Sequence, residues 1–281
     1  ATRGPAVQER GRPYHGSQWA PARSTDSSVA DVDAADRFAA LVQGPPDHLR
    51  ARLDEAALLI AAQARPDLDI GAYLRRLDRL AATCPEPTVD GLRRHLFTVH
   101  GFAGNTADYY DPANSYLDQV LDRGLGLPIT LAIMMMEVAR RLGVTLYGLN
   151  NPGHFLVRHG LAQPPELYDP FDGGRGVDPA GIDPAILEPA GAPVILARTL
   201  ANLDQIFRRR GDRRSREWAT RLRASVPGVP LEARAEWADA LAGVGRLGDA
   251  ADVLDRLAEL SGDEKGERFA GAASRLRARL N

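Results

Sequence analysis

The sequence has little cysteine and no long apolar run, and each shortage excludes a class of protein. One cysteine in 281 residues excludes an internal disulfide framework and a cysteine-based structural zinc site. The longest apolar stretches, residues 56–62 and 131–136, are far shorter than the ~20 residues that span a bilayer. The first residues also lack the apolar segment of a signal peptide. We therefore expect a soluble cytoplasmic protein with no membrane partner.

An excess of charge of one sign is missing as well. Lysine and arginine total 35 against 37 acidic residues, a formal net charge of −2. This balance gives no support for electrostatic capture of nucleic acid. The basic run at residues 208–216 is local and interrupted by Asp212, as in a solvated helix end. We expect no nucleic-acid partner.

Apolar residues at helical spacing are the main pattern that is present. The clearest segment is 126–143, where Pro128 suits the first turn and Gly143 the stop. This segment is apolar on nearly all sides up to Glu137, so we expect a central, buried helix. The other predicted helices cover residues 47–60, 70–82, 89–97, a segment beginning at 115, and then 194–209, 213–224, 231–244, 250–260 and 267–280.

A short β region interrupts the helices. Residues 144–149 and 154–159 read as strands, a third strand ends at 167–169, and a glycine-rich loop follows at 170–176. The pattern predicts a helix-rich α+β fold in which the central helix packs on a small antiparallel sheet. In the last third, two similar turns begin 37 residues apart, at Arg210 and Leu247. That spacing is near the ~34-residue period of tetratricopeptide repeats.

The β region also carries the residues with the most chemistry. His154 opens one predicted strand and Asp169 ends the next, so antiparallel pairing can bring them side by side. A carboxylate beside a histidine orients the imidazole ring and stabilises its charged form. The helix start at residues 127–130 offers free N–H groups and positive potential. Together these are the parts of a cysteine-type acyl-transfer site.

Four motifs in this order resemble the SirB-type transglutaminase-like family. They are NSYLDQVLDR at 114–123, GLPITL at 126–131, PGHFLVR at 152–158 and DPFDGG at 169–174. The resemblance runs from about residue 38 to the end and implies a transglutaminase core, related to the papain-like fold, followed by helical repeats. The expected division is a flexible leader over 1–34, helices plus core over 35–190, and tetratricopeptide-like repeats over 191–281.

The resemblance also assigns the site. Active transglutaminases carry Cys, His and Asp, and His154 and Asp169 match the latter two. At the nucleophile position, near the start of the central helix, this chain has Pro128. Thr130 is the nearest hydroxyl and a tentative third catalytic residue, although it can equally bond within the first helical turn. Cys84 lies far upstream and is expected to be an incidental thiol.

These residues leave the function open between two main readings. The chain is either a protein that binds a peptide or protein segment in the His154/Asp169 cleft with a regulatory role, or an amide or ester hydrolase or acyl-transfer enzyme. In the second reading His154 is the general base and Asp169 orients it. His154 and Asp169 can also serve only to hold two strands together. We expect no cofactor and no metal, because His154, His159, Asp169 and Asp172 match no ligand motif.

Overall fold

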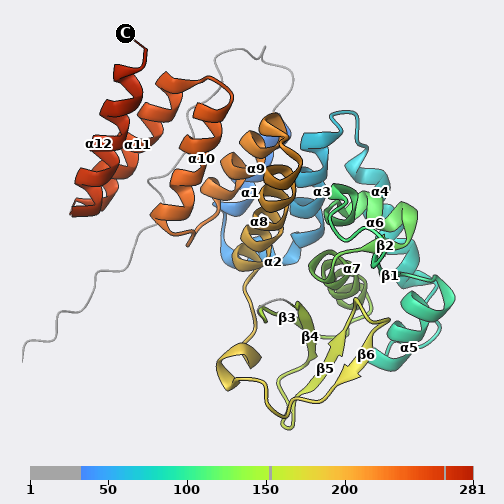
Figure 1. Cartoon of the computed structure of the whole chain (residues 1–281). Helices are drawn as coiled ribbons and strands as arrows, with labels where there is room; N and C mark the ends of the chain where they lie inside the picture. Colours follow the sequence, from blue (N-terminus) through green and yellow to red (C-terminus); the bar gives the residue numbers. More distant parts are fainter. Residues whose placement is uncertain (1–32, 152–153, 263, 281) are drawn as a thin grey trace, which may run out of the picture.

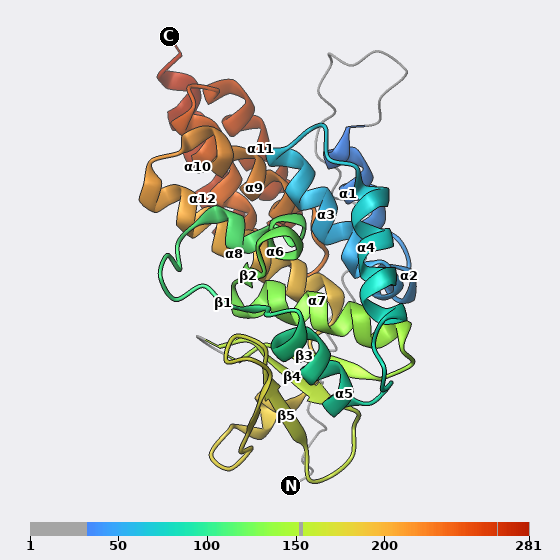
Figure 2. The same ribbon diagram turned by 90° about the vertical axis from the view of Figure 1, so that its right-hand side faces the viewer.

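Helix α7 (Pro128–Arg141) runs through the middle of the structure, a computed structural model in which residues 33–151, 154–262 and 264–280 are described. A small sheet covers one side of α7 and helices cover the others (Figures 1 and 2). Every residue from Pro128 to Ala139 is buried, which confirms the prediction of a central helix. Within the described ranges, no helix combines the length and apolarity needed to cross a membrane.

The N-terminal helices differ from the predicted ones at two places. The helix expected over 47–60 is divided, because Arg52 (φ −130°, ψ 30°) leaves the helical conformation. The helix expected over 89–97 is capped by Thr88 and ends in a π-helical turn, Arg94–Val99. The leader expected over 1–34 lies almost wholly outside the described residues. The helices are α1 (Ala34–Val42), α2 (Pro46–Ala51), α3 (Leu53–Ala64), α4 (Ile70–Ala82) and α5 (Val89–Arg93).

Between α5 and α7 the chain makes a short parallel pairing that the sequence does not reveal. Strands β1 (Ala103–Gly104) and β2 (Leu125–Gly126) flank helix α6 (Leu117–Arg123). The backbone N–H of Leu127 donates to the carbonyl of Asn114 at 3.1 Å. These bonds tie the long polar loop to the residues just before α7 and so fix where that helix begins.

The sheet is an antiparallel meander in the order β3-β4-β5-β6. The three predicted strands are present, although the second begins two residues after His154. A fourth strand begins within the predicted glycine-rich loop. There, Gly173 (φ 59°) and Gly174 (φ 70°) make the left-handed turn that leads into it. The strands are β3 (Leu146–Leu149), β4 (Leu156–His159), β5 (Glu166–Asp169) and β6 (Arg175–Val177).

The last third is helical, and each helix packs against the next one in the chain. The predicted helices are present to within a few residues. The main hydrophobic cluster extends from Ala35 to Val229 and includes the apolar faces of the first two of these helices, whereas the last three form a second cluster around Trp237 and Leu241. The tetratricopeptide assignment stays a prediction. The helices are α8 (Ala192–Arg210), α9 (Arg213–Ser225), α10 (Leu231–Gly243), α11 (Leu247–Ser261) and α12 (Glu264–Ala278).

A partly buried charged network joins the end of α7 to α3 and α4. The Glu137 carboxylate accepts hydrogen bonds from Arg140 Nε at 2.9 Å and Arg141 Nη1 at 3.1 Å. Arg141 also donates to Asp54 at 2.6 Å and to Asp78 at 2.7 Å. Burial, reinforced by the nearby charge of Asp54, raises the pKa of Glu137 to about 7 even though both arginines oppose this shift.

The pKa of Glu137 predicts a pH-dependent stability. The folded state favours the protonated carboxyl, so this contribution to stability is complete below the unfolded pKa and is lost as the pH rises from about 4.5 to about 7. We expect the unfolding free energy of the wild type to fall by up to about 3 kcal/mol relative to Glu137→Gln over this range. Urea unfolding of both proteins at several pH values measures the difference. Glu86→Gln, at an exposed carboxylate, is the control, and parallel curves for wild type and Glu137→Gln would contradict the prediction.

Candidate functional site

The structure brings His154 and Asp169 together. His154 Nε2 is hydrogen-bonded to Asp169 Oδ2. The other carboxylate oxygen, Oδ1, accepts from the backbone N–H of Phe171 at 2.9 Å and of Asp172 at 3.4 Å. The Asp169 side chain is 9% exposed and the His154 side chain 45%. The buried carboxylate therefore holds the ring by Nε2, and Nδ1 has no hydrogen-bond partner among the described residues.

A row of aromatic rings leads away from this pair. The rings of His154 and Phe171 meet edge to face with centroids 6.3 Å apart, and Phe171 meets Tyr109 in the same way at 5.9 Å. Gly104 in β1 supports Phe171, because its N–H donates to the Phe171 carbonyl at 3.2 Å. A Cβ atom at Gly104 would lie only 2.4 Å from the Phe171 ring. The position of this ring thus depends on a glycine in β1.

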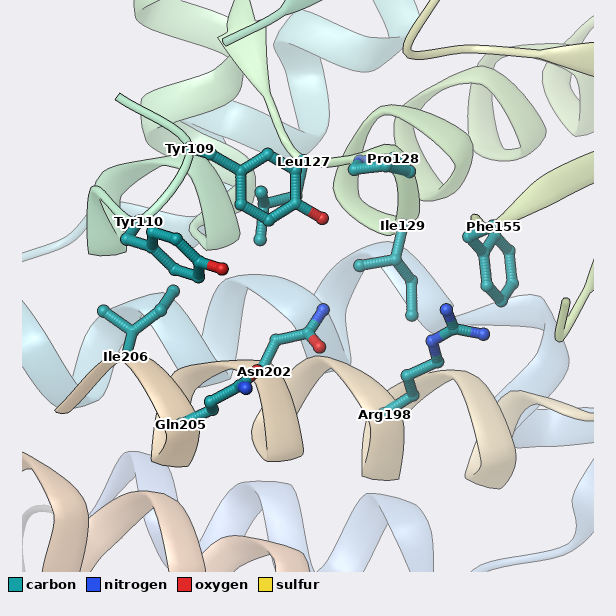
Figure 3. Close-up of a pocket in the computed structure, with 10 residues that line it drawn as sticks. All are labelled: Tyr109, Tyr110, Leu127, Pro128, Ile129, Phe155, Arg198, Asn202, Gln205 and Ile206. Atoms are coloured by element: carbon teal, nitrogen blue, oxygen red, sulfur yellow. The ribbon is translucent and has the colours of Figure 1, made fainter. Parts of the chain in front are cut away.

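The row borders a cavity of about 290 Å³ between the start of α7 and helix α8 (Figure 3). Pro128 forms part of its wall, so the position where the resemblance expects a nucleophile does face a cavity. The predicted cleft differs in one respect: His154 and Asp169 do not line this cavity but lie beside it, beyond Phe171. The lining residues are Tyr109, Tyr110, Leu127, Pro128, Ile129, Phe155, Arg198, Asn202, Gln205 and Ile206.

Neither Thr130, the candidate hydroxyl, nor Cys84, the expected incidental thiol, hydrogen-bonds to the pair. Thr130 is 1% exposed, and its hydroxyl bonds no described group, neither His154 nor the first turn of α7. The helical rotation that turns Pro128 and Ile129 to the cavity turns Thr130 into the core. Cys84 lies in the turn between α4 and α5, where its Sγ donates to the Glu86 carbonyl at 3.3 Å. A catalytic role for His154, Asp169 or Thr130 stays a prediction.

The second histidine of the β region is engaged elsewhere. His159 Nδ1 lies 2.8 Å from a carboxylate oxygen of Glu166 at the opposite end of β4. Within the described ranges, no three His, Cys, Asp or Glu side chains converge as metal ligands would. The expectations of no metal and no cofactor stay predictions.

Sequence reasoning missed the contribution of α8 to the cavity. Arg198, Asn202 and Gln205 follow one another at helical spacing and point toward the start of α7 in Figure 3. The spacing of these polar residues was the available signal, but a polar stripe on a helix usually faces solvent. Only the packing of α8 across α7 shows that this stripe lines a cavity.

Gly104 offers a test of how the site is built. Gly104→Ala forces Phe171 away from its place, because the new methyl group overlaps the ring. We expect a loss of about 1–3 kcal/mol in unfolding free energy, the usual cost of overpacking. Gly176→Ala in β6 is the matched control, since a Cβ there meets nothing closer than 4.0 Å. Urea unfolding compares the variants, and equal stability of the two would contradict the assigned role of Gly104.

The structure thus combines a buried helix, a small antiparallel sheet packed on it and a hydrogen-bonded His154–Asp169 pair at the edge of that sheet. Residues 47–206 match the transglutaminase-like superfamily, to which the chain therefore belongs. The match begins inside α2 and ends inside α8, so it covers the sheet, the His–Asp pair and all the described residues that line the cavity.

Relatives of this chain are found in bacteria and, over a shorter stretch, in mammals. A UPF0162 protein of Xylella fastidiosa is 38% identical over 206 residues, which is 63% of this chain and 73% of that protein. A UPF0162 protein of Pseudomonas aeruginosa is 33% identical over 195 residues, 61% of this chain and 69% of that protein. Human F-box only protein 21 is 38% identical over 84 residues, 30% of this chain and 13% of that protein. No solved structure matches the chain significantly.

Proposed function

We propose that this chain is a SirB-type member of the superfamily that works without thiol chemistry and binds a peptide or protein segment in the cleft beside His154, with a regulatory role in the cytoplasm. The observation that carries the proposal is Pro128 in the cavity wall. No Cys, Ser or Thr stands among the described lining residues. Covalent acyl transfer needs such a nucleophile next to its base, so binding is the function that this geometry supports best.

The lining chemistry favours a peptide as the occupant. The Tyr109 and Tyr110 side chains are large, rigid and partly exposed, at 39% and 41%, and such rings contribute contact area at little cost in entropy. Asn202 and Gln205 offer amides that can donate to and accept from a peptide backbone. An extended segment presents both kinds of partner at every residue.

The C-terminal helices support a second docking surface. Helices α8 to α12 pack in sequence, each against the next, which is how helical repeats build extended binding faces. We assign them as degenerate tetratricopeptide-like repeats. In this proposal the cleft and the helical array engage two parts of one protein partner.

Peptide selection tests the proposal for the cleft. Random peptides displayed on phage are selected on the wild-type chain, and the enriched sequences are synthesised with a fluorescent label. Asn202→Trp places an indole in the cavity, and we expect it to weaken binding by about tenfold or more. Val194→Trp is the matched control, because Val194 lies on the same helix, is 45% exposed and does not line the cavity. Fluorescence polarisation measures each dissociation constant.

Two results would overturn the binding proposal. One is that no peptide is enriched on the wild type over the Asn202→Trp variant. The other is that enriched peptides bind Asn202→Trp as well as they bind the wild type, which places them elsewhere on the surface.

A hydrolase is the second candidate, and one observation favours it. The His154 ring is held through Nε2, is 45% exposed and has Nδ1 open, so Nδ1 can take a proton from water that attacks an ester or amide. This function predicts that turnover of nitrophenyl esters or peptide anilides by the wild type falls about a hundredfold or more in His154→Ala. His159→Ala is the control, since His159 pairs with Glu166. Equal turnover in wild type and His154→Ala would exclude this candidate.

A further inference from the structure

Arg198 is the charged residue among the described residues that line the cavity, and no carboxylate lines it. The side chain rises from α8 toward the start of α7, between Ile129 and Phe155 (Figure 3). Its Cζ atom lies 5.5 Å from the centroid of the Phe155 ring, over the ring face. The cavity therefore carries a positive charge whose orientation is fixed by an aromatic ring.

The hydrogen bonds of Arg198 use only one edge of the guanidinium. Nη1 donates to Asn150 Oδ1 at 2.6 Å and to the Asn151 carbonyl at 2.8 Å. Nε and Nη2 bond no group in the described part of the chain, and Arg198 forms no ion pair there. These two nitrogens form the flat edge that binds both oxygens of a carboxylate. The edge suited to bidentate binding is thus the open one.

The other arginines of α8 have different contacts from those of Arg198. Arg208 pairs with Asp204 at 2.8 Å, and Arg210 lies 3.9 Å from Asp108. Arg209 stacks on the Tyr110 ring at 4.1 Å. Arg208 and Arg210 thus face a carboxylate within the chain, whereas Arg198 and Arg209 each contact an aromatic ring and form no ion pair among the described residues. Of these two, Arg198 is the one that lines the cavity.

The surroundings of Arg198 are unusual for an unpaired cation. Partial burial lowers the pKa of its guanidinium, because desolvation disfavours the charged form; an arginine nevertheless remains charged in a protein. A partly desolvated charge without a counter-ion is unfavourable. The acceptors on Asn150 and Asn151 are neutral, and a neutral donor such as an amide could bond them equally, so these bonds do not explain why a full charge is placed here.

The groups around the cavity reinforce the preference for an anion. Asn202 and Gln205 bring side-chain amides on the next turns of α8, and the Tyr109 and Tyr110 hydroxyls point into the same space (Figure 3). Helix α7 starts at this wall without a side chain capping its N–H groups, so its positive end faces the cavity.

We propose that Arg198 anchors a carboxylate of the bound segment through Nε and Nη2, and that the cleft selects peptides by this group. The carboxylate is either the free C-terminus of the segment or an Asp or Glu side chain within it. This inference rests on the proposed peptide-binding function and adds the chemical class of the ligand. Asn202 and Gln205 then bond the neighbouring peptide groups.

Four fluorescent pools of random hexapeptides test the inference by polarisation. Each pool has either a free or an amidated C-terminus. Within each of these two kinds, one pool contains Glu among its random residues and the other contains Gln in its place. We expect wild type to bind at least one carboxylate-bearing pool about tenfold or more tightly than the pool that is amidated and carries Gln. Which of the two single-carboxylate pools binds distinguishes a C-terminal carboxylate from a side-chain one.

Variants separate recognition by Arg198 from its structural role. Arg198→Met and the isosteric Asn202→Asp, which adds a negative charge beside Arg198, should both abolish the preference for carboxylate. Arg213→Met, at an exposed position on α9, is the charge-matched control and should keep it. Asn150→Ala removes one bond of Nη1 only and should also keep it. Thermal unfolding verifies that each variant is folded.

The outcomes distinguish this inference from the function on which it rests. Equal binding of all four pools to wild type, or an unchanged preference in Arg198→Met and Asn202→Asp, overturns the carboxylate anchor and leaves peptide binding intact. If no pool binds wild type, the proposed function and this inference both fail. Loss of the preference in Arg213→Met would show that general charge, not Arg198, is responsible.

Discussion

The burial of α7 from Pro128 to Ala139 is the constraint on which the rest of the structure depends. Its residues from Pro128 to Ala139 have no face for solvent, so apolar partners must cover the helix on every side. The sheet covers one side and α3, α4, α6 and α8 cover others. The elements that pack on α7 come from distant parts of the chain, and they leave a cavity at the beginning of this helix. The cavity lies at this junction, so its position follows from how the helix is buried.

The same constraint explains how the fold tolerates proline at the expected nucleophile position. The first residue of a helix needs no N–H, so Pro128 suits the start of α7. The His154–Asp169 pair does not depend on a nucleophile either. Asp169 also accepts from the backbone of Phe171, which makes it part of the turn that holds the aromatic row. Its hydrogen bonds within this turn therefore explain the presence of the Asp169 carboxylate whether or not the chain is an enzyme.

The sequence pattern predicted most helices and three of the four strands of the main sheet, because the residues that form each of these elements are neighbours in the chain. The continuous apolar run and its terminal proline and glycine located α7. Residue types and turn signals located β3 to β5, and the order of these strands predicted His154 near Asp169. The break at Arg52 and the two-residue pairing of β1 with β2 escaped prediction. The pairing joins Ala103 to Leu125 across helix α6, and such a contact leaves no periodic signal in the sequence. Arg198 escaped for the same reason: its partners at Asn150 and Asn151 lie 48 and 47 residues away, and periodicity along one helix carries no information about them.

Helix α8 belongs both to the wall of the cavity and to the C-terminal helical stack. One face completes the cavity through Arg198 and Asn202, and the other begins the stack that continues through α9. A cut at the predicted boundary near residue 190 would therefore open the cavity and expose the core that α8 covers. Helix α8 is therefore packed into the main hydrophobic cluster and into the C-terminal helical stack at the same time. The wall of the cleft and the first layer of the stack are one helix, so neither can be removed without the other.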